Sequence, residues 1–253
     1  IERLGLAGAA PWLGAGLFFG IAPVAMLLFR PSPASMGLAA DGDDVPDGAP
    51  GSEPTVNGVP YHVAVRSRFF VLATVTFMTS MMAQVGSIAH QFSLVAGRAD
   101  DRDLAALAVS VMAGFSIAGR LAGGWVLPHI SSRLFMGGLL IVQAIALSLY
   151  AVAATPTTLL MVAALFGVTV GNLLMMQPLL IAEAFGTMAY ARIYSTSQLF
   201  TTLGVASGPA AYGLIYEAAN GYTASYLYGA AASIIGLVAI LAAGPVEQEQ
   251  QKA

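Results

Sequence analysis

The segment FFVLATVTFMTSMMAQVGSIAHQF, residues 69–92, is apolar and long enough to cross roughly 30 Å of hydrocarbon as a helix. Polar side chains nevertheless recur within it at steps of three or four and share one helix face: Thr76, Ser80, Gln84, Ser87 and Gln91. Lipid does not tolerate such a face, because it offers the polar groups no hydrogen-bond partners. The segment therefore predicts a membrane helix that turns one side toward other helices or toward water.

The whole chain has the composition of a membrane protein. Of its 253 residues 57% are hydrophobic and 9% charged, and the mean hydropathy of +0.77 lies outside the range of soluble domains. Six further stretches resemble the first in length and character: Pro11–Phe29, Leu104–Leu127, Leu134–Ala154, Leu159–Ala182, Ile193–Tyr216 and Tyr222–Ala243. None shows the period-two alternation of a membrane barrel. The predicted fold class is all-α, a polytopic membrane helical bundle.

The seven predicted spans are of two kinds. Three of them carry almost no polar side chains: Pro11–Phe29, Leu134–Ala154 and Tyr222–Ala243. The other four carry Gln, Asn, Thr, Ser or His at helical spacing. We expect the polar four to face each other or water and the apolar three to face lipid. Polar side chains inside a membrane bundle are typical of a transporter.

Residues 30–68 form the one long connection between predicted spans. They include six prolines, many glycines and five acidic residues, a composition that buries too little apolar surface to order itself. We therefore expect residues 1–29 to end one bundle, residues 30–68 to be a cytoplasmic linker, and residues 69–244 to form a six-helix transmembrane bundle. Residues 245–253 are expected to be a cytoplasmic tail. Because the chain starts at Ile1 directly before a span, it has the character of a fragment without its upstream part.

Basic residues near the span ends predict the orientation. With the linker in the cytoplasm, that side carries Arg30, Arg66, Arg68, Arg133, Arg192 and Lys252. The opposite side then carries Arg3, Arg98 and Arg102. The excess favours a cytoplasmic linker and tail, and a multi-pass protein of the plasma (inner) membrane.

Three spans carry polar side chains that are candidates for substrate contacts. Gln84 lies on the stripe described above, Asn172 shares a face with Thr169 and Met176, and Gln198 shares a face with Tyr194 and Thr201. Hydrogen bonding between helices, worth about 0.6 kcal/mol per bond, is one interpretation. An aqueous path for a substrate is the other, and three polar faces in one bundle favour it.

Arg120 is the one basic residue deep inside a predicted span. It lies about 24 Å along the helix from Leu104, and Ser116 precedes it by one turn on the same face. No Asp or Glu lies at a comparable depth in the seven spans. Arg120 therefore either extends to the lipid headgroups, or faces water and binds an anion or a carboxylate of the missing part.

His90 is the side chain of the spans that changes charge near neutral pH. Since it lies near the outer end of its helix, we expect a gating role, with proton coupling as the alternative. Small residues also recur at the Gly-x-x-x-Gly spacing of close helix pairs: Gly16/Gly20, Gly119/Gly123, Gly167/Gly171 and Gly204/Gly208. A group of tyrosines late in the chain is interpreted as an interfacial belt: Tyr212, Tyr216, Tyr222, Tyr226 and Tyr228.

Several segments resemble the C-terminal part of transporters of the major facilitator superfamily, from the sixth of twelve helices onward. They are RPSPASMGLAADGDD (30–44), RSRFF (66–70), GSIAHQ (86–91), SIAGRLAGGWVLPHISSR (116–133) and AEAFGTMAYARIYSTSQLFTTLGVASGPAAYGLIYEAANGY (182–222). Within the superfamily the chain is most similar to the monocarboxylate and oxalate/formate group. The resemblance covers nearly the whole chain and implies the superfamily's C-terminal six-helix bundle plus one preceding helix.

The resemblance also implies roles for single residues. Arg120 corresponds to the helix-eight arginine that engages a substrate carboxylate, His90 to the helix-seven histidine, and Arg133 to the arginine of the inner gate. The Asp that normally precedes that inner arginine has no counterpart in residues 127–129. No second cation lies between Arg192 and Lys252, so a monoanion fits better than a dicarboxylate.

The expected function is secondary active transport of a small organic anion, monocarboxylate-like and proton-coupled, by alternating access. Its partners would be the anion, protons, the lipid bilayer and a missing N-terminal bundle. No enzyme activity, cofactor, metal site or nucleic-acid binding is expected, since the sequence has no cysteine and no catalytic or phosphate-binding motif. Efflux of neutral or cationic drugs is an alternative. A seven-helix receptor is another, although the one lysine, Lys252, lies in the tail and cannot hold retinal within a membrane.

Overall fold

The computed structural model describes residues 58–244 continuously, together with isolated positions between 11 and 23. The chain divides into two units, Ile1–Thr55 and Val56–Ala253, and the fold described below is that of the second. The first predicted span, most of the predicted linker and the tail lie outside the described residues. The domain division made from the sequence therefore stays a prediction.

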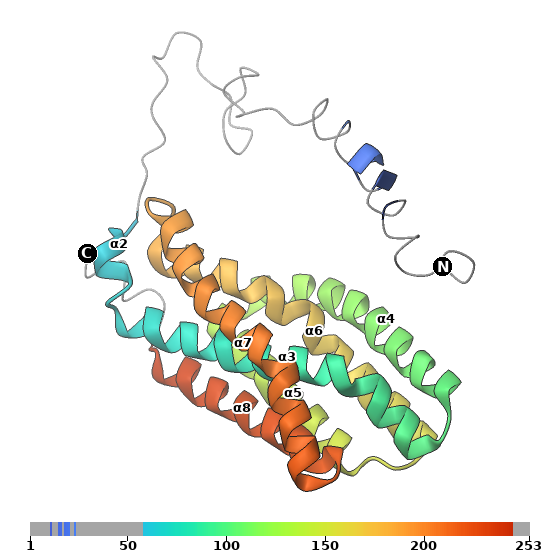
Figure 1. The fold of residues 1–253 in the computed structure, drawn as a ribbon. Coiled ribbons are helices and arrows are strands. Elements are labelled where there is room, and N and C mark those ends of the chain that lie inside the picture. The colour runs from blue at the N-terminus through green and yellow to red at the C-terminus, as the bar shows by residue number, and fades with distance from the viewer. Residues whose placement is uncertain (1–10, 12–14, 17, 21–22, 24–57, 245–253) are drawn as a thin grey trace. The chain divides into compact units, whose positions relative to one another are not determined.

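Each of the six predicted spans in the described part of the chain is a helix (Figure 1). The long helices are α3 (Arg68–Ala99), α4 (Arg102–Val126), α5 (Ser132–Val152), α6 (Pro156–Phe185), α7 (Tyr190–Ala219) and α8 (Tyr222–Ala242). A short α2 (Tyr61–Ala64) precedes them, and a 3-10 turn η3 (Leu127–His129) follows α4. The fold class is thus all-α over the described residues, as predicted.

Polar residues directly before the apolar runs determine where four helices begin. The side chains of Ser67, Asp101, Ser131 and Thr155 accept hydrogen bonds from backbone N–H groups in the first turns of α3, α4, α5 and α6. Such caps satisfy donors that have no partner within the helix. In α6, Pro156 follows the cap at the first helical position, where a missing N–H costs nothing. The helices consequently begin a few residues before the apolar spans.

Five of the described helices are long and apolar enough to cross a membrane: α3, α4 with η3, α5, α6 and α8. The chain is therefore a multi-pass membrane protein. Helix α7 has 30 residues, as many as α6, but it is not apolar enough to be counted with these five. Hydroxyl and amide side chains between Tyr194 and Thr202 make it more polar than the prediction of an ordinary span implied.

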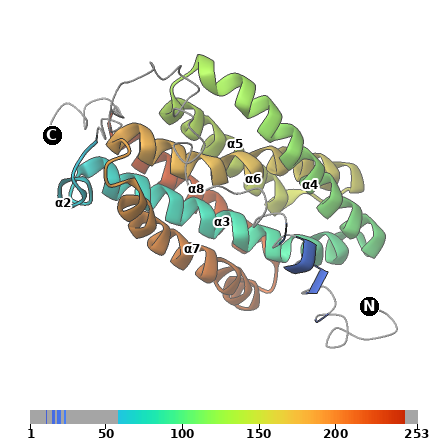
Figure 2. The ribbon, with the colours of Figure 1, turned by 90° about the horizontal axis from the view of Figure 1, so that it is seen from above.

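Helices α3–α5 and α6–α8 form two sets of three, and corresponding helices of the two sets make corresponding contacts across the bundle (Figures 1 and 2). Helix α3 packs against α7 and α8, and α6 packs against α4 and α5 in the corresponding way. Helices α5 and α8, which end the two sets, pack against each other. Because successive helices reverse direction, α3 and α6 begin at opposite ends of the bundle. The arrangement is that of an inverted repeat, which many transporter folds share.

Glycines allow the two principal helix pairs to approach closely. A Cβ atom added to Gly204 would lie 2.2 Å from the carbonyl oxygen of Met78, and one added to Gly167 would lie 2.4 Å from that of Met112. The first contact joins α7 to α3, and the second joins α6 to α4. The prediction of close helix pairs at Gly119/Gly123, Gly167/Gly171 and Gly204/Gly208 is confirmed.

The expected division into inner and outer helices holds only in part. Helices α5 and α8 present apolar side chains outward, as predicted, with Ile145 49% and Ile235 55% exposed. Helix α4 was expected among the inner helices, yet it lies at the edge of the bundle and its Leu121 is 75% exposed. The difference arises because α4 contacts mainly α6 and leaves its other faces open.

The end of the predicted linker is folded. Val59 donates its backbone N–H to the carbonyl of Phe185 (2.9 Å), and Val59 and Ala64 are buried. The expectation that residues 30–68 lack packed structure is therefore wrong for residues 58–67. Gly58 permits the contact, because a Cβ atom there would lie 2.6 Å from the carbonyl oxygen of Phe185. The glycine serves close approach here rather than chain flexibility.

The interpretation of the late tyrosines as an interfacial belt is wrong for Tyr212 and Tyr226, which are fully buried. Both pack edge-on against each other, and the Tyr212 hydroxyl donates to the carbonyl of Ala83 (3.2 Å). Tyr216, 41% exposed, does lie at the surface. Spacing along α7 and α8 did not reveal that α3 covers the inner tyrosines.

Arg98, at the end of α3, has a structural role that the sequence did not indicate. Its guanidinium donates to the carbonyls of Tyr150, Ala151 (2.8 Å) and Ala153 (2.7 Å) at the end of α5. The last carbonyls of a helix have no partner within it and carry partial negative charge, so a cation stabilises them. Arg98 thereby ties α3 to α5 at this end of the bundle.

Candidate functional site

The polar stripe of α3 faces the interior of the bundle, as predicted. All five of its side chains are at most 1% exposed. Most of them bond to neighbouring helices: Thr76 to the carbonyl of Gly236, Ser87 to the hydroxyl of Tyr212, and Gln91 to the carbonyl of Ala108. Ser80 bonds within its own helix. For these four residues, hydrogen bonding between and within helices is therefore the better interpretation, rather than the lining of an aqueous path.

Gln84 is the residue of the stripe whose side chain forms no hydrogen bond within the described residues, although Oε1 of Gln91 is also without a partner. Gln84 is 1% exposed, and its amide Nε2 has no hydrogen-bond partner. A buried donor without an acceptor costs free energy, so such a group in a folded protein points to a ligand or a water molecule.

Asn172 joins α6 to α4. Its Nδ2 donates to the carbonyl of Gly119 (2.8 Å) and to that of Val168 (2.9 Å), and it is 3% exposed. Its Oδ1 lies directly over Gly123, where an added Cβ atom would be only 2.1 Å away. Both amide hydrogens of Asn172 are therefore used in packing between and within helices, and its oxygen lies against Gly123.

Arg120 and Ser116 border the same contact between α4 and α6. The Nε of Arg120 donates to the carbonyl of Gly171 (3.2 Å). A Cβ atom added to Gly171 would lie 2.5 Å from the carbonyl oxygen of Ser116 and 2.8 Å from Nε of Arg120. Arg120 is exposed and Ser116 is half-buried. We define Ser116, Arg120, Gly171 and Asn172 as the α4–α6 seam.

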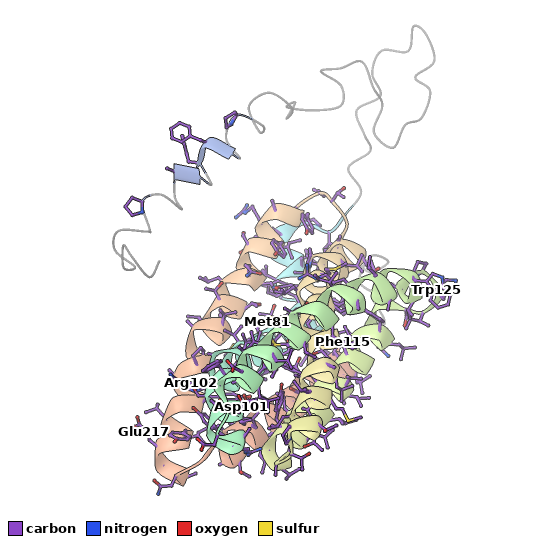
Figure 3. All side chains as sticks on the ribbon, turned by 90° about the vertical axis from the view of Figure 1, so that its right-hand side faces the viewer. Met81, Asp101, Arg102, Phe115, Trp125 and Glu217 are labelled. Carbon is purple, nitrogen blue, oxygen red and sulfur yellow. The ribbon has the colours of Figure 1, made fainter. Side chains whose placement is uncertain are left out.

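The charge of Arg120 has no carboxylate partner among the described residues. One N–H group is donated to Gly171, and Arg120 as a whole is exposed. Figure 3 shows Phe115 midway along α4 and Trp125 near its end; these side chains are 46% and 75% exposed. An arginine held at a fixed place on an open helix face can bind a carboxylate through two parallel hydrogen bonds.

Gln177 and Gln198 differ in their hydrogen bonding. Gln177 of α6 is buried, and its Nε2 donates to Ser197 and Thr201 of α7 (3.0 Å each). Ser197 also accepts a hydrogen bond from Thr74 of α3 (3.1 Å). Gln198 is half-buried, and its side chain forms no hydrogen bond within the described part of the chain. The network through Ser197 was missed from the sequence, because Ser197 does not belong to the stripe that predicted Gln198.

The two glutamines are expected to respond differently to the same change. Gln177→Met keeps the shape but removes two buried hydrogen bonds, so it should lower the free energy of unfolding by about 1–2 kcal/mol. Gln198→Met should leave stability unchanged within about 0.5 kcal/mol. Unfolding of both variants in detergent, followed by circular dichroism, measures this. Equal stability losses would contradict the assignment of Gln177 as the packing residue and Gln198 as the free one.

His90 links three helices at the end of the bundle where α3 ends. Its Nε2 lies 3.0 Å from the carbonyl oxygen of Pro209 in α7, and its Nδ1 lies 3.4 Å from the hydroxyl of Tyr222 in α8. A carbonyl only accepts hydrogen bonds, so Nε2 carries the proton that is donated to Pro209. The ring also stacks on Tyr212, with centroids 6.0 Å apart. This geometry holds α3, α7 and α8 together, and the gating role expected from the sequence stays a prediction.

Arg133 lies in the first turn of α5, at the opposite end of the bundle from His90. It is half-buried, and within the described residues its guanidinium forms no hydrogen bond or ion pair. The adjacent Ser132 donates to Oε1 of Glu183 (2.6 Å), which brings a carboxylate from the end of α6 to this position. The resemblance implied an acidic residue before Arg133 in the chain; the carboxylate that the fold brings to this end bonds to Ser132 and not to Arg133.

The structure thus brings three of the five predicted substrate contacts together. Ser116, Arg120 and Asn172 meet at the α4–α6 seam, while Gln84 on α3 and Gln198 on α7 lie outside it. His90 and Arg133 lie at the two ends of the bundle. Gly171 was not predicted as a site residue, although its place in a Gly-x-x-x-Gly pair was the available signal.

These features define a polytopic all-α membrane protein with two inverted three-helix sets and one unpaired arginine on a polar seam. No protein family profile and no curated protein matches the sequence. Among solved structures, the fold is similar to that of a variant of the E. coli fucose:proton symporter FucP, with a TM-score of 0.57 and 13% sequence identity. The match covers 72% of this chain and 44% of that chain, so this chain spans less than half of the symporter.

Proposed function

We propose that this chain forms one bundle of a secondary transporter that carries a small organic anion by alternating access. The observation that carries the proposal is Arg120, a cation without a carboxylate partner in the described residues, fixed by Gly171 on a polar seam. A cation within the hydrocarbon region of a membrane is costly, so it is retained where it binds something. Ser116 and the Oδ1 of Asn172 complete a polar surface around it.

The fold supports the transporter part of the proposal. A bundle like that of a proton symporter is what the resemblance to the major facilitator superfamily implies. In such transporters two bundles rock about a site near the middle of the membrane. The other half of the site would then come from an N-terminal bundle, and the multi-pass protein would lie in the plasma (inner) membrane.

The resemblance to the monocarboxylate and oxalate/formate group supports the nature of the substrate. One arginine at the seam neutralises one negative charge, so a monocarboxylate suits it better than a dicarboxylate. Gln84 and Gln198 lie outside the seam, so they are proposed to meet the substrate elsewhere along its path. His90 would gate one end of the bundle, and it is the proposed site of coupling to protons.

A neutral sugar is the second candidate substrate. The symporter with the similar fold carries fucose, according to its description. The amide groups of Gln84, Asn172 and Gln198 are suited to sugar hydroxyls. A sugar, however, would leave the charge of Arg120 without a partner. Efflux of neutral or cationic drugs has the same difficulty, and Arg120 would repel a cation.

The decisive experiment is uptake by the intact protein in proteoliposomes. The panel should contain lactate, pyruvate, formate, oxalate, fucose and a cationic dye, each with and without an inward proton gradient. We expect uptake of the monocarboxylates, accelerated by the gradient. Uptake of fucose or of the dye, with none of the acids, would contradict the anion assignment.

A further inference from the structure

A groove of roughly 590 Å³ opens at the end of the bundle where α6 passes into α7. Its walls come from two segments far apart in the chain, residues 60–62 and residues 187–192. The lining includes the side chains of Tyr61, His62, Tyr190 and Arg192. None of these belongs to the α4–α6 seam, and the proposed transport does not use the groove.

Arg192 is held in the groove by an aromatic ring. Its guanidinium carbon lies 4.3 Å from the centre of the Tyr61 ring. The hydroxyl of Tyr61 is hydrogen-bonded to that of Thr196 (3.1 Å), which fixes the ring one turn further along α7. When a guanidinium lies over an aromatic ring, its N–H groups stay free to donate hydrogen bonds at the edge of the guanidinium plane.

The guanidinium of Arg192 has no hydrogen bond and no ion pair with any described residue. Its donors are therefore oriented but unused. The planar fork of an arginine matches carboxylate and phosphate oxygens, so an anion is the ligand that this arrangement fits. The neighbouring ring of His62, which is exposed, adds a second donor.

The two ends of the bundle differ in charge over the described residues. The end with the groove carries Arg66, Arg68, Arg133 and Arg192, with Glu183 as its carboxylate. The other end carries Asp100, Asp101, Asp103 and Glu217, with Arg98 and Arg102. A basic end of a membrane bundle attracts the anionic lipids of the adjacent leaflet.

Exposed apolar side chains distinguish a lipid from a small soluble anion. Val63, beside the groove on α2, is 42% exposed, and Met188 in the groove wall is 53% exposed. A free phosphate gains nothing from such neighbours. A phospholipid places its glycerol and upper acyl carbons directly next to its phosphate, where these side chains would cover them.

We propose that the groove binds the headgroup phosphate of an anionic phospholipid, with Arg192 as the direct contact and Tyr61 as the residue that positions it. The segment before α3 is thereby attached both to the turn between α6 and α7 and to the lipid surface. The bound lipid would hold this end of the bundle at the membrane surface. The proposal does not depend on which substrate the protein transports.

Native mass spectrometry of the intact protein, titrated with phosphatidylglycerol in detergent, tests the proposal through the affinity for the first lipid bound. Arg192→Gln should weaken that affinity roughly fivefold, the effect expected for one basic residue at a lipid surface. Tyr61→Leu, which removes the stacking ring, should weaken it by a smaller factor. Arg68→Gln is the matched control, because Arg68 is exposed at the same end but does not line the groove.

Three outcomes would overturn the proposal. The first is an unchanged affinity in both the Arg192 and the Tyr61 variants. The second is an equal loss in Arg68→Gln, which would indicate general attraction to the basic end rather than a site. The third is displacement of the lipid by an equal concentration of inorganic phosphate, or equally tight binding of phosphatidylcholine. Thermal unfolding of each variant in detergent shows that its fold is intact.

Discussion

Arg120→Gln in the intact protein should abolish uptake of small carboxylates while leaving expression and thermal stability unchanged. The guanidinium is exposed on α4 and makes one hydrogen bond, to the carbonyl of Gly171, so its loss removes little of the packing. Glutamine keeps a similar length and an amide donor but no charge. Losing a charge-assisted contact to a carboxylate costs about 1.5–3 kcal/mol, or at least tenfold in apparent affinity, and the translocation step should fail with it.

Arg120→Lys is the informative companion variant. It keeps the charge but offers a single point donor in place of the planar fork, so uptake should persist with a raised KM. Arg102→Gln, at the opposite end of the same helix and exposed, is the matched control and should transport normally. Normal monocarboxylate uptake by Arg120→Gln would remove the basis of the anion assignment, whatever the behaviour of the lysine variant.

Gly204→Ala should destabilise the bundle although it adds a single methyl group. That methyl carbon would lie 2.2 Å from the carbonyl oxygen of Met78 and 3.0 Å from its carbonyl carbon. Both atoms belong to the backbone of α3, so α3 and α7 must separate along their length. Overpacking of this kind costs about 1–3 kcal/mol, which corresponds to several degrees in the melting temperature. Gly167→Ala should behave alike, since it meets the carbonyl of Met112.

Gly114→Ala and Gly124→Ala are the matched controls. Both glycines lie within α4, and neither has an atom within 4 Å of the position that a Cβ would take. Since alanine is favoured over glycine in a helix by about 1 kcal/mol, these variants should be as stable as the wild type or slightly more so. Melting curves in one detergent at one heating rate compare all four. A stability loss in the controls equal to that of Gly204→Ala would show that the helix pairs are not closely packed.

Much of the fold was predictable because membrane helices are recognised from local properties. Apolar length marks a span, and a polar residue such as Ser67 or Thr155 before it marks the helix start. The burial of the stripe on α3 followed from its spacing alone. The close pairs at Gly167/Gly171 and Gly204/Gly208 were also visible, since small residues one turn apart have few other uses in lipid.

The sequence predicted which residues belong to the candidate site but not which of them lie together. Arg120 stood out because a charge in an apolar helix is costly, and Ser116 because it lies one turn away. Their meeting with Asn172 depends on α6 lying against α4, a contact between segments separated by a third helix. The burial of Tyr212 and the packing of Val59 on Phe185 have the same origin, since each requires knowledge of which helix covers which face.

Sequence by itself determined that this protein is a helical membrane bundle, which faces of its helices are polar and which end is basic. These are properties of composition and of a repeat of 3.6 residues, and they need no partner. The tertiary structure decided which polar groups are used between helices and which stay free. Gln177 and Gln198 look alike in sequence, and Arg192 looks like any arginine at a span end. They differ because hydrogen bonds and ring contacts across the bundle depend on distances that local periodicity does not encode.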